Sequence, residues 1–397
     1  MSTFDEVCAR IAANDPDMQY ADRVSFDMND EQTIRLASAL LVNTSLESLA
    51  ISIRNMSTES ARELARVLRA NKTMRSLRIN CQRNGECARE LISALNDNTT
   101  VDSLTLIIWQ YADCMRAIEY VIATSKTLRT FALYTLRSID ITPAIRANTS
   151  ITHLDLSECA FDKRALFNVL RAQNITIRKL YLSDVIMRDE DTRELTRMLL
   201  VNTTLTLLAL PHTGIEQQGA REIAHALRIN RTLQSLDLRG CRMCDDGIIA
   251  IANALTNANC TLEHLNVSNC RITSIGIDAI VRMLRGNTSL ATLDISKNGV
   301  GKNEACELAS ALEANAALRL LSVCRSRSAF ACGKRTWILL EAFVSVTRTQ
   351  RSKDGMHAIV RAARDPHSPL SLLPGDGTIL RDICKMCKVP PIIITHQ

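Results

Sequence analysis

The chain of 397 residues repeats itself about every 28 residues between Leu46 and Ser326. Each copy carries the pattern L-x-x-L-x-L, and its ninth position is often Cys or Asn. The best copies begin at Ile151, Leu233, Leu262 and Leu290. A period of this length indicates a solenoid, in which each unit packs only on its neighbours and the stack offers one long binding surface. The repeat therefore overrides the two or three separate domains that such a length would otherwise suggest.

Each copy divides into two halves. The L-x-L stretch alternates apolar and polar side chains, as a short strand with one buried face does. The second half has helical spacing, for example at Ala61, Leu64, Ala65 and Leu68. A strand, a turn, a helix and a return loop make one right-handed turn of a parallel coil.

The second Leu of each copy marks an expected strand. Eleven strands are predicted, at Leu49, Leu77, Leu104, Phe131, Leu154, Leu180, Leu208, Leu236, Leu265, Leu293 and Leu321. Val24–Phe26 is a candidate for a degenerate first strand. Strands lie closer together than helices, so we expect them on the inside of a bend. The predicted regions are an N-terminal cap with the degenerate first repeat (1–45), the solenoid (46–326) and a basic, mainly helical C-terminal cap and tail (327–397).

These repeats resemble those of leucine-rich-repeat proteins. Their long helical halves are similar to the ribonuclease-inhibitor class, which includes the receptor portion of NOD-like receptors, and to the related repeats of Ran GTPase-activating proteins. Residues 205–255 and 262–312 match the unit almost position by position. The resemblance implies an α/β horseshoe solenoid of about eleven repeats, with a parallel inner β-sheet and outer helices. It says much less about the partner.

N-x-[ST] sequons recur at the repeat period. They lie at Asn43, Asn71, Asn98, Asn148, Asn174, Asn202, Asn230 and Asn287. Because they follow the predicted helices, we interpret them as structural asparagines that end a helix in the left-handed conformation. This interpretation is favoured over glycosylation.

The fourteen cysteines predict free thiols in a reducing compartment, since no secretory signal is recognised. Cys159, Cys241 and Cys270 occupy the ninth position, where a small buried hydrophobe is expected. The longest apolar run, near Trp337 to Val346, is too short to span a bilayer. We therefore expect a soluble protein of the cytoplasm, with the nucleus as the alternative.

One unit departs from the period. The spacing between Phe131 and Leu154 falls to 23, Pro143 lies inside the expected helix, and Ser125 replaces the usual Asn. Aromatic residues gather nearby, at Trp109, Tyr111, Tyr120, Phe131 and Tyr134. A local change of curvature is the simpler interpretation, and a binding site is the alternative.

Side chains alternate across a strand, so residues between the strand leucines are expected on the inner face. They include Arg78, Asn80, Thr105, Ile107 and Ala132 in the N-terminal half and His264, Asn266 and Ser296 in the C-terminal half. The candidate protein-binding residues are Trp109, Tyr134, Tyr181, Asp155, Asp237, Arg239 and Asp294. Aromatic and charged residues together have the composition of a protein-binding surface. For any one of these residues, solvated surface is the competing interpretation.

Catalytic signals are weak. Cys241-x-x-Cys244 and Cys384-x-x-Cys387 each have half the spacing of a zinc site, but Cys241 is already a repeat position. Neither a G-x-S-x-G context nor a Walker-type phosphate loop occurs. The sequence predicts neither an enzyme nor a bound cofactor or metal.

The tail differs from the repeats. Residues 325–397 carry 12 Lys and Arg against 5 Asp and Glu, whereas the rest of the chain is nearly neutral. Stacking aromatics are not interleaved with these basic residues, so nucleic-acid binding is not predicted. The segment near 370–383 resembles the short adaptor-binding boxes, F-box or SOCS-box-like, of ubiquitin-ligase subunits. The candidate box residues are Leu373, Pro374, Ile379, Leu380 and Ile383, and a helix packed on the last repeat is the alternative.

The sequence thus favours a non-catalytic interaction scaffold or receptor that binds a protein partner on its concave face. Resemblance suggests two alternatives. One is a small-GTPase regulator of the Ran-activating type, although the tail is basic rather than acidic. The other is a substrate receptor that joins a ubiquitin-ligase adaptor.

Overall fold

The computed structural model describes residues 4–21, 28–53, 55–81, 84–109, 114–135, 138–172, 176–257 and 261–323. The chain divides into two compact units. The first contains Met1–Val185 with Val201–Ala209, and the second contains Ile186–Leu200 with Leu210–Gln397. The candidate strand at Val24–Phe26 and the predicted tail at 327–397 lie outside the described residues, so the predicted domain boundaries stay a prediction.

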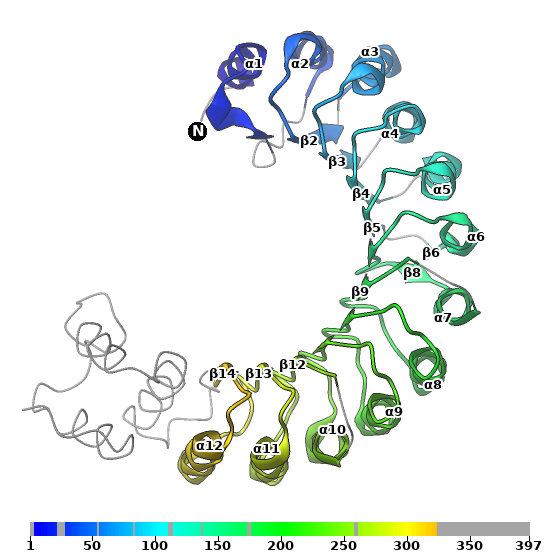
Figure 1. Ribbon diagram of the computed structural model, residues 1–397. Helices are drawn as coiled ribbons and strands as arrows, with labels where there is room; N and C mark the ends of the chain where they lie inside the picture. The colour runs from blue at the N-terminus through cyan, green and yellow to red at the C-terminus, as the bar shows by residue number, and fades with distance from the viewer. Residues whose placement is uncertain are drawn as a thin grey trace, which may run out of the picture. The chain divides into compact units, whose positions relative to one another are not determined.

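Parallel strands form the inner layer of the first unit (Figure 1). They pair in chain order as β1 (Tyr20–Ala21), β2 (Ser48–Ile53), β3 (Ser76–Cys81), β4 (Ser103–Ile108), β5 (Thr130–Tyr134), β7 (His153–Asp155), β9 (Lys179–Tyr181) and β10 (Leu207–Ala209). Their register aligns the second Leu of each copy, so that Leu77, Leu104 and Phe131 lie side by side. These side chains are fully buried, which is why the repeat keeps an apolar residue there.

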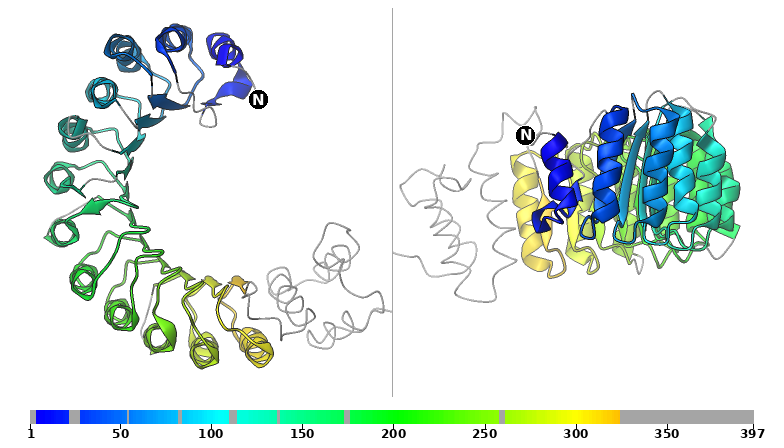
Figure 2. Two further views of the ribbon diagram at one scale, coloured as in Figure 1. Left: turned by 180° about the vertical axis from the view of Figure 1, so that it is seen from behind. Right: turned by 90° about the horizontal axis from the view of Figure 1, so that it is seen from above.

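Helices cover one side of these strands, and Figure 2 shows them running beside the strands. They are α1 (Phe4–Ala12), α2 (Asp30–Val42), α3 (Thr58–Ala70), α4 (Gly85–Ser93), α5 (Met115–Thr124), α6 (Thr142–Ala147) and α7 (Lys163–Ala172), with 3-10 turns at Pro16–Met18 and Ala94–Asn96. In α3, the predicted Ala61, Leu64, Ala65 and Leu68 are all buried. The helical spacing seen in the sequence therefore marks the face that packs on the sheet.

The second unit repeats the same scheme. Its strands β11 (Ser235–Asp237), β12 (His264–Asn266), β13 (Thr292–Asp294) and β14 (Leu320–Ser322) pair parallel in chain order. Its helices are α8 (Asp189–Leu199), α9 (Gln217–Leu227), α10 (Cys244–Asn257), α11 (Ser274–Gly286) and α12 (Lys302–Ala314). All eleven strands predicted from the repeat are present in the two units together. None of the described helices is long and apolar enough to cross a membrane.

The sequon asparagines that the structure describes are buried, but the predicted conformation is wrong. Asn43, Asn71, Asn148 and Asn287 follow their helices in extended backbone, with φ between −66° and −80°. Their role comes from the side-chain amide. Asn148 Oδ1 accepts hydrogen bonds from the backbone of Ser150 and Ile151, and its Nδ2 donates to the carbonyl of Ile122 in the preceding repeat.

The same pattern recurs along the chain. Other sequon residues whose Nδ2 donates to a carbonyl of an earlier repeat are Asn98, Asn202, Asn230 and Asn287. Asn174 lies outside the described residues. Since glycan attachment needs an exposed amide nitrogen, these buried and bonded amides support the structural interpretation of the sequons.

The ninth-position cysteines are buried, as predicted, and their thiols also bridge repeats. Cys159 donates to the carbonyl of Leu133, and Cys270 to that of Leu238. In the neighbouring copy, Asn298 makes the equivalent bond to Val267 with its amide. Burial raises the pKa of Cys159 to about 12, so this thiol stays protonated near neutral pH.

In the short repeat, Pro143 lies inside the helix, as expected, and occupies the first turn of α6. Proline fits there because its missing N–H would have no intrahelical partner. The helix is only six residues long, which accounts for the shorter spacing. Beside it, β6 (Ser138–Ile139) and β8 (Ala160–Phe161) add a small parallel pair.

Candidate protein-binding site

The strand register of the first unit places the inner-face residues in rows. One row runs across four neighbouring strands from Arg78 through Thr105 and Ala132 to Asp155, and continues to Tyr181 on β9. Because alternate side chains of a strand point to opposite faces, these side chains lie on the face away from the buried leucines. The prediction of inner-face positions is thus confirmed for this row.

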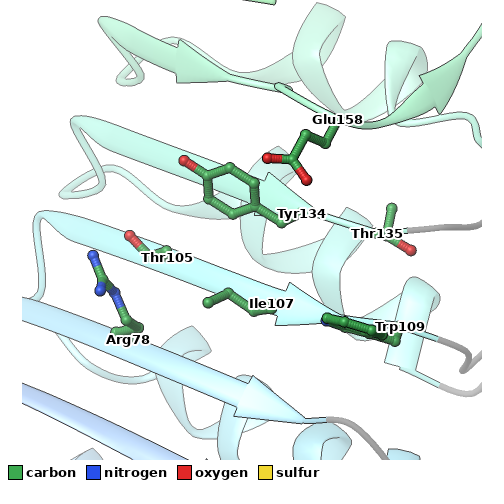
Figure 3. A pocket seen from close by; sticks show the side chains of 7 residues that line it. All are labelled: Arg78, Thr105, Ile107, Trp109, Tyr134, Thr135 and Glu158. Carbon is green, nitrogen blue, oxygen red and sulfur yellow. The ribbon is translucent and has the colours of Figure 1, made fainter. Parts of the chain in front are cut away.

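A hollow of about 390 Å³ opens on this face. It is lined by Arg78, Thr105, Ile107, Trp109, Tyr134, Thr135 and Glu158 (Figure 3). Trp109 directly follows β4, and 45% of its surface is exposed. An exposed indole next to a second ring and an aliphatic side chain offers apolar area that a partner can cover.

Tyr134 is held in place by its neighbour. Its hydroxyl donates a hydrogen bond of 2.7 Å to Oδ2 of Asp155. Oδ1 of the same carboxylate accepts from the backbone N–H of Ser157. Burial, the bond to Asp155 and the charge of that carboxylate all raise the pKa of Tyr134, so the hydroxyl keeps its proton. Burial and the charge of Asp155 also raise the pKa of Tyr181.

Two charged side chains complete the lining. Arg78 lies on β3, and Glu158 lies in the turn after β7, where its φ of 60° is left-handed. Both are exposed, and neither forms an ion pair within the described part of the chain. In Figure 3 the Glu158 carboxylate points toward the Tyr134 ring, and Arg78 extends from the opposite side of the hollow.

The structure therefore brings together four of the predicted residues: Trp109, Tyr134, Asp155 and Tyr181. Thr135 and Glu158 were not predicted, because the candidates were taken from positions that alternate with the strand leucines. Glu158 lies between Leu156 and Cys159 of the repeat motif. That fixed place in the motif was the signal that could have found it.

The other three predicted residues lie in the second unit. Asp237 and Asp294 line a smaller hollow of about 240 Å³, together with His264 and Asn266. Arg239 lies two residues after Asp237 and is exposed. The second unit thus keeps a group of its own, and its residues are not part of the hollow beside Trp109.

Asp237 and Asp294 of the second unit also have a structural role. Oδ1 of Asp237 accepts from the backbone N–H of Arg239, and Oδ1 of Asp294 accepts from that of Ser296. These bonds fix the turn that ends each strand. Burial is the main reason why the pKa of Asp237 is raised, and the nearby Asp294 adds to it.

Neither a metal site nor the adaptor box can be placed. Within the described ranges, no group of three or more His, Cys, Asp and Glu residues is arranged to hold a metal ion. The candidate box residues between Leu373 and Ile383 and the Cys384–Cys387 pair lie outside those ranges.

Comparison with known families matches the repeat itself. The family model described as Leucine Rich repeat fits residues 147–166, 230–252 and 258–281. The chain thus contains leucine-rich repeats. Its helices α3, α11 and α12, each of 13 residues, accord with the ribonuclease-inhibitor-like class that the sequence resembles.

Two solved structures each match about a third of the chain. A structure titled Leiomodin-1 Actin-Binding Site 2 shares 24% identity at a TM-score of 0.30, covering 34% of this chain and 82% of its own. The C-terminal domain of tropomodulin from Caenorhabditis elegans shares 15% identity at a TM-score of 0.34, covering 38% and 92%. No curated protein matches the chain.

Proposed function

We propose that this leucine-rich-repeat protein is a non-catalytic interaction scaffold that holds a protein partner on the inner face of its first unit. The observation that carries the proposal is the hollow beside Trp109, where an exposed indole adjoins Ile107 and Tyr134. Tryptophan, tyrosine and arginine are the residues that most often dominate the energy of protein interfaces.

The hydrogen bond between Tyr134 and Asp155 supports the same proposal. A ring that is already fixed loses little freedom when a partner covers it, so more of the contact energy remains as affinity. The floor of the hollow also lies on strands, which hold their side chains more firmly than loops do. A partner therefore meets a surface that needs little rearrangement.

The two alternative functions stay predictions. None of the described residues favours a GTPase-activating role, and the adaptor box lies outside the described ranges. Stimulated GTP hydrolysis by a Ran-type GTPase would support the first alternative. Co-purification of a ligase adaptor with residues 366–397 would support the second.

The test is affinity purification from the native cell with three full-length forms. These are the wild type, the double variant Trp109→Ala with Tyr134→Ala, and the control Tyr120→Ala. Tyr120 is also an exposed aromatic, at 56%, but it lies on α5. We expect the double variant to bind its partners about thirtyfold or more weakly, as after the loss of paired hot-spot residues, and so not to recover them. The control should keep them.

Circular dichroism of each variant separates lost binding from lost folding. A chain lacking residues 330–397 should still hold the partner. The proposal fails if the double variant folds and purifies the same proteins as the wild type, or if only removal of the tail abolishes binding.

A further inference from the structure

Two opposite charges flank the hollow of the first unit, and neither forms an ion pair with another described residue. Arg78 projects from β3, and Glu158 from the turn after β7 (Figure 3). β3 and β7 are three steps apart in the sheet, which is about 14 Å at the usual strand spacing. In Figure 3, Ile107 and Tyr134 lie between the two charges, and Trp109 lies to one side of them, at the end of β4.

The neighbouring acid does not share this role. The Asp155 carboxylate is already engaged, by the Tyr134 hydroxyl through one oxygen and by the Ser157 backbone through the other. Arg78 has small neighbours across the sheet, Ala50 on one side and Thr105 on the other. Among the described residues, its guanidinium forms no ion pair with a carboxylate.

A partner that covers the apolar part of the hollow also takes water away from both charges. Covering a charge without pairing it is costly, and this cost falls when the partner supplies the opposite charge. A wholly acidic segment would meet Glu158, and a wholly basic one would meet Arg78. The hollow thus selects for charges of both signs, in a fixed order.

From this geometry, and resting on the proposed function, we infer the chemistry of the occupant. It is a protein segment with an apolar side chain between Ile107, Trp109 and Tyr134. An acidic residue of this segment faces Arg78, and a basic residue on the other side of the apolar one faces Glu158. Arginine suits this role because its planar fork can donate two hydrogen bonds to one carboxylate.

The inference is tested with a random peptide library displayed on phage, selected against the full-length chain. Only peptides whose binding is lost in Trp109→Ala are scored, because they use the hollow. We expect them to carry an acidic and a basic residue on opposite sides of an apolar one. Arg78→Glu should weaken such a peptide about tenfold or more, as loss of a hydrogen bond to a charged group does.

Charge exchange makes the test specific. Replacing the acidic residue of the peptide by Lys should restore binding to the Arg78→Glu variant. Replacing the basic residue of the peptide by an acidic one should likewise restore binding to the Glu158→Lys variant. Arg116→Glu is the matched control, since Arg116 is an exposed arginine on α5, away from the hollow, and should change nothing.

Three results would overturn the inference. They are Trp109-dependent peptides without charge preference, an affinity that Arg78→Glu leaves unchanged, or a library that yields no Trp109-dependent peptide. The co-purification experiment decides separately on the proposed function. If one of these three results is found while co-purification of partners still depends on Trp109 and Tyr134, the hollow binds proteins by other chemistry.

Discussion

The asparagine that follows α6 shows how one side chain joins two repeats. Asn148 is 7% exposed, and its Nδ2 donates a bond of 2.6 Å to the carbonyl of Ile122. Its Oδ1 accepts from the backbone of Ser150 at 2.8 Å and from Ile151 at 2.7 Å. Replacing Asn148 by Ala removes these three bonds and the longer ones from Nδ2 to the Ser125 carbonyl and the Ser150 hydroxyl.

The magnitude follows from what is left unpaired. Ile122 and Ile151 are both fully buried, so the freed carbonyl and N–H are shielded from water. Each unsatisfied buried group costs about 1–3 kcal/mol, which gives about 2–5 kcal/mol for Asn148→Ala. Asn148→Ser should cost about half of this. Ser125, at the equivalent place in the preceding repeat, accepts the local bond from the Leu128 backbone with its hydroxyl.

Hydrogen exchange measured by mass spectrometry over α5, α6 and β7 reports the free energy of opening at this junction. The control is Thr149→Ala, next in the chain and exposed, which should change that free energy by less than about 0.5 kcal/mol. If Asn148→Ala behaves like Thr149→Ala, the amide does not hold the repeats together, and the structural explanation of the sequons is wrong.

Three further predictions concern thiols, a turn and the site. Iodoacetamide near neutral pH should label exposed Cys306 and spare Cys159, as peptide mass spectrometry would show. Burial raises the pKa of Cys159 from 9.0 to about 12, so the stability that this protonated thiol contributes should be lost as pH rises through this range. Urea unfolding of the wild type and of Cys159→Ala at several pH values measures this loss. Gly240→Ala should lower stability by about 1–2 kcal/mol, because φ at Gly240 is 72° and the added Cβ would meet the His212 ring. Adding His212→Ala to Gly240→Ala should relieve only the contact with the ring and leave the strain of the positive φ. Full rescue of the thermal midpoint would therefore contradict the argument from backbone strain. Tyr134→Phe should cost about 1 kcal/mol in urea unfolding, by loss of its bond to Asp155, and no change would show that this bond does not fix the ring.

Much of the fold was predictable because its signals are local. Alternation of side chains in L-x-L gives the strand, helical spacing gives the helix, and the period joins them into units. Leu154 and Leu208 were found in this way, and both lie in the aligned and buried row. The same reasoning placed Trp109 and Tyr134 on the inner face.

The errors lie where one repeat meets the next. The conformation of Asn148 depends on the carbonyl of Ile122, 26 residues earlier in the chain, and the motif does not reveal this partner. Glu158 escaped prediction because it lies in a turn, outside the alternation of the strands. The helix around Pro143 has only six residues, and the average repeat does not predict so short a helix.

The sequence by itself determined the architecture and the inner face, because burial of one side of a strand and one side of a helix is written into a short period. Only the tertiary structure decided which inner-face residues form one hollow and which of their charges are already paired. Strand register sets the first, since it places Arg78 beside Thr105 and Ile107 beside Tyr134, although these residues come from different repeats. Hydrogen bonding sets the second, since Asp155 is bound to Tyr134 whereas Arg78 and Glu158 have no ion-pair partner among the described residues.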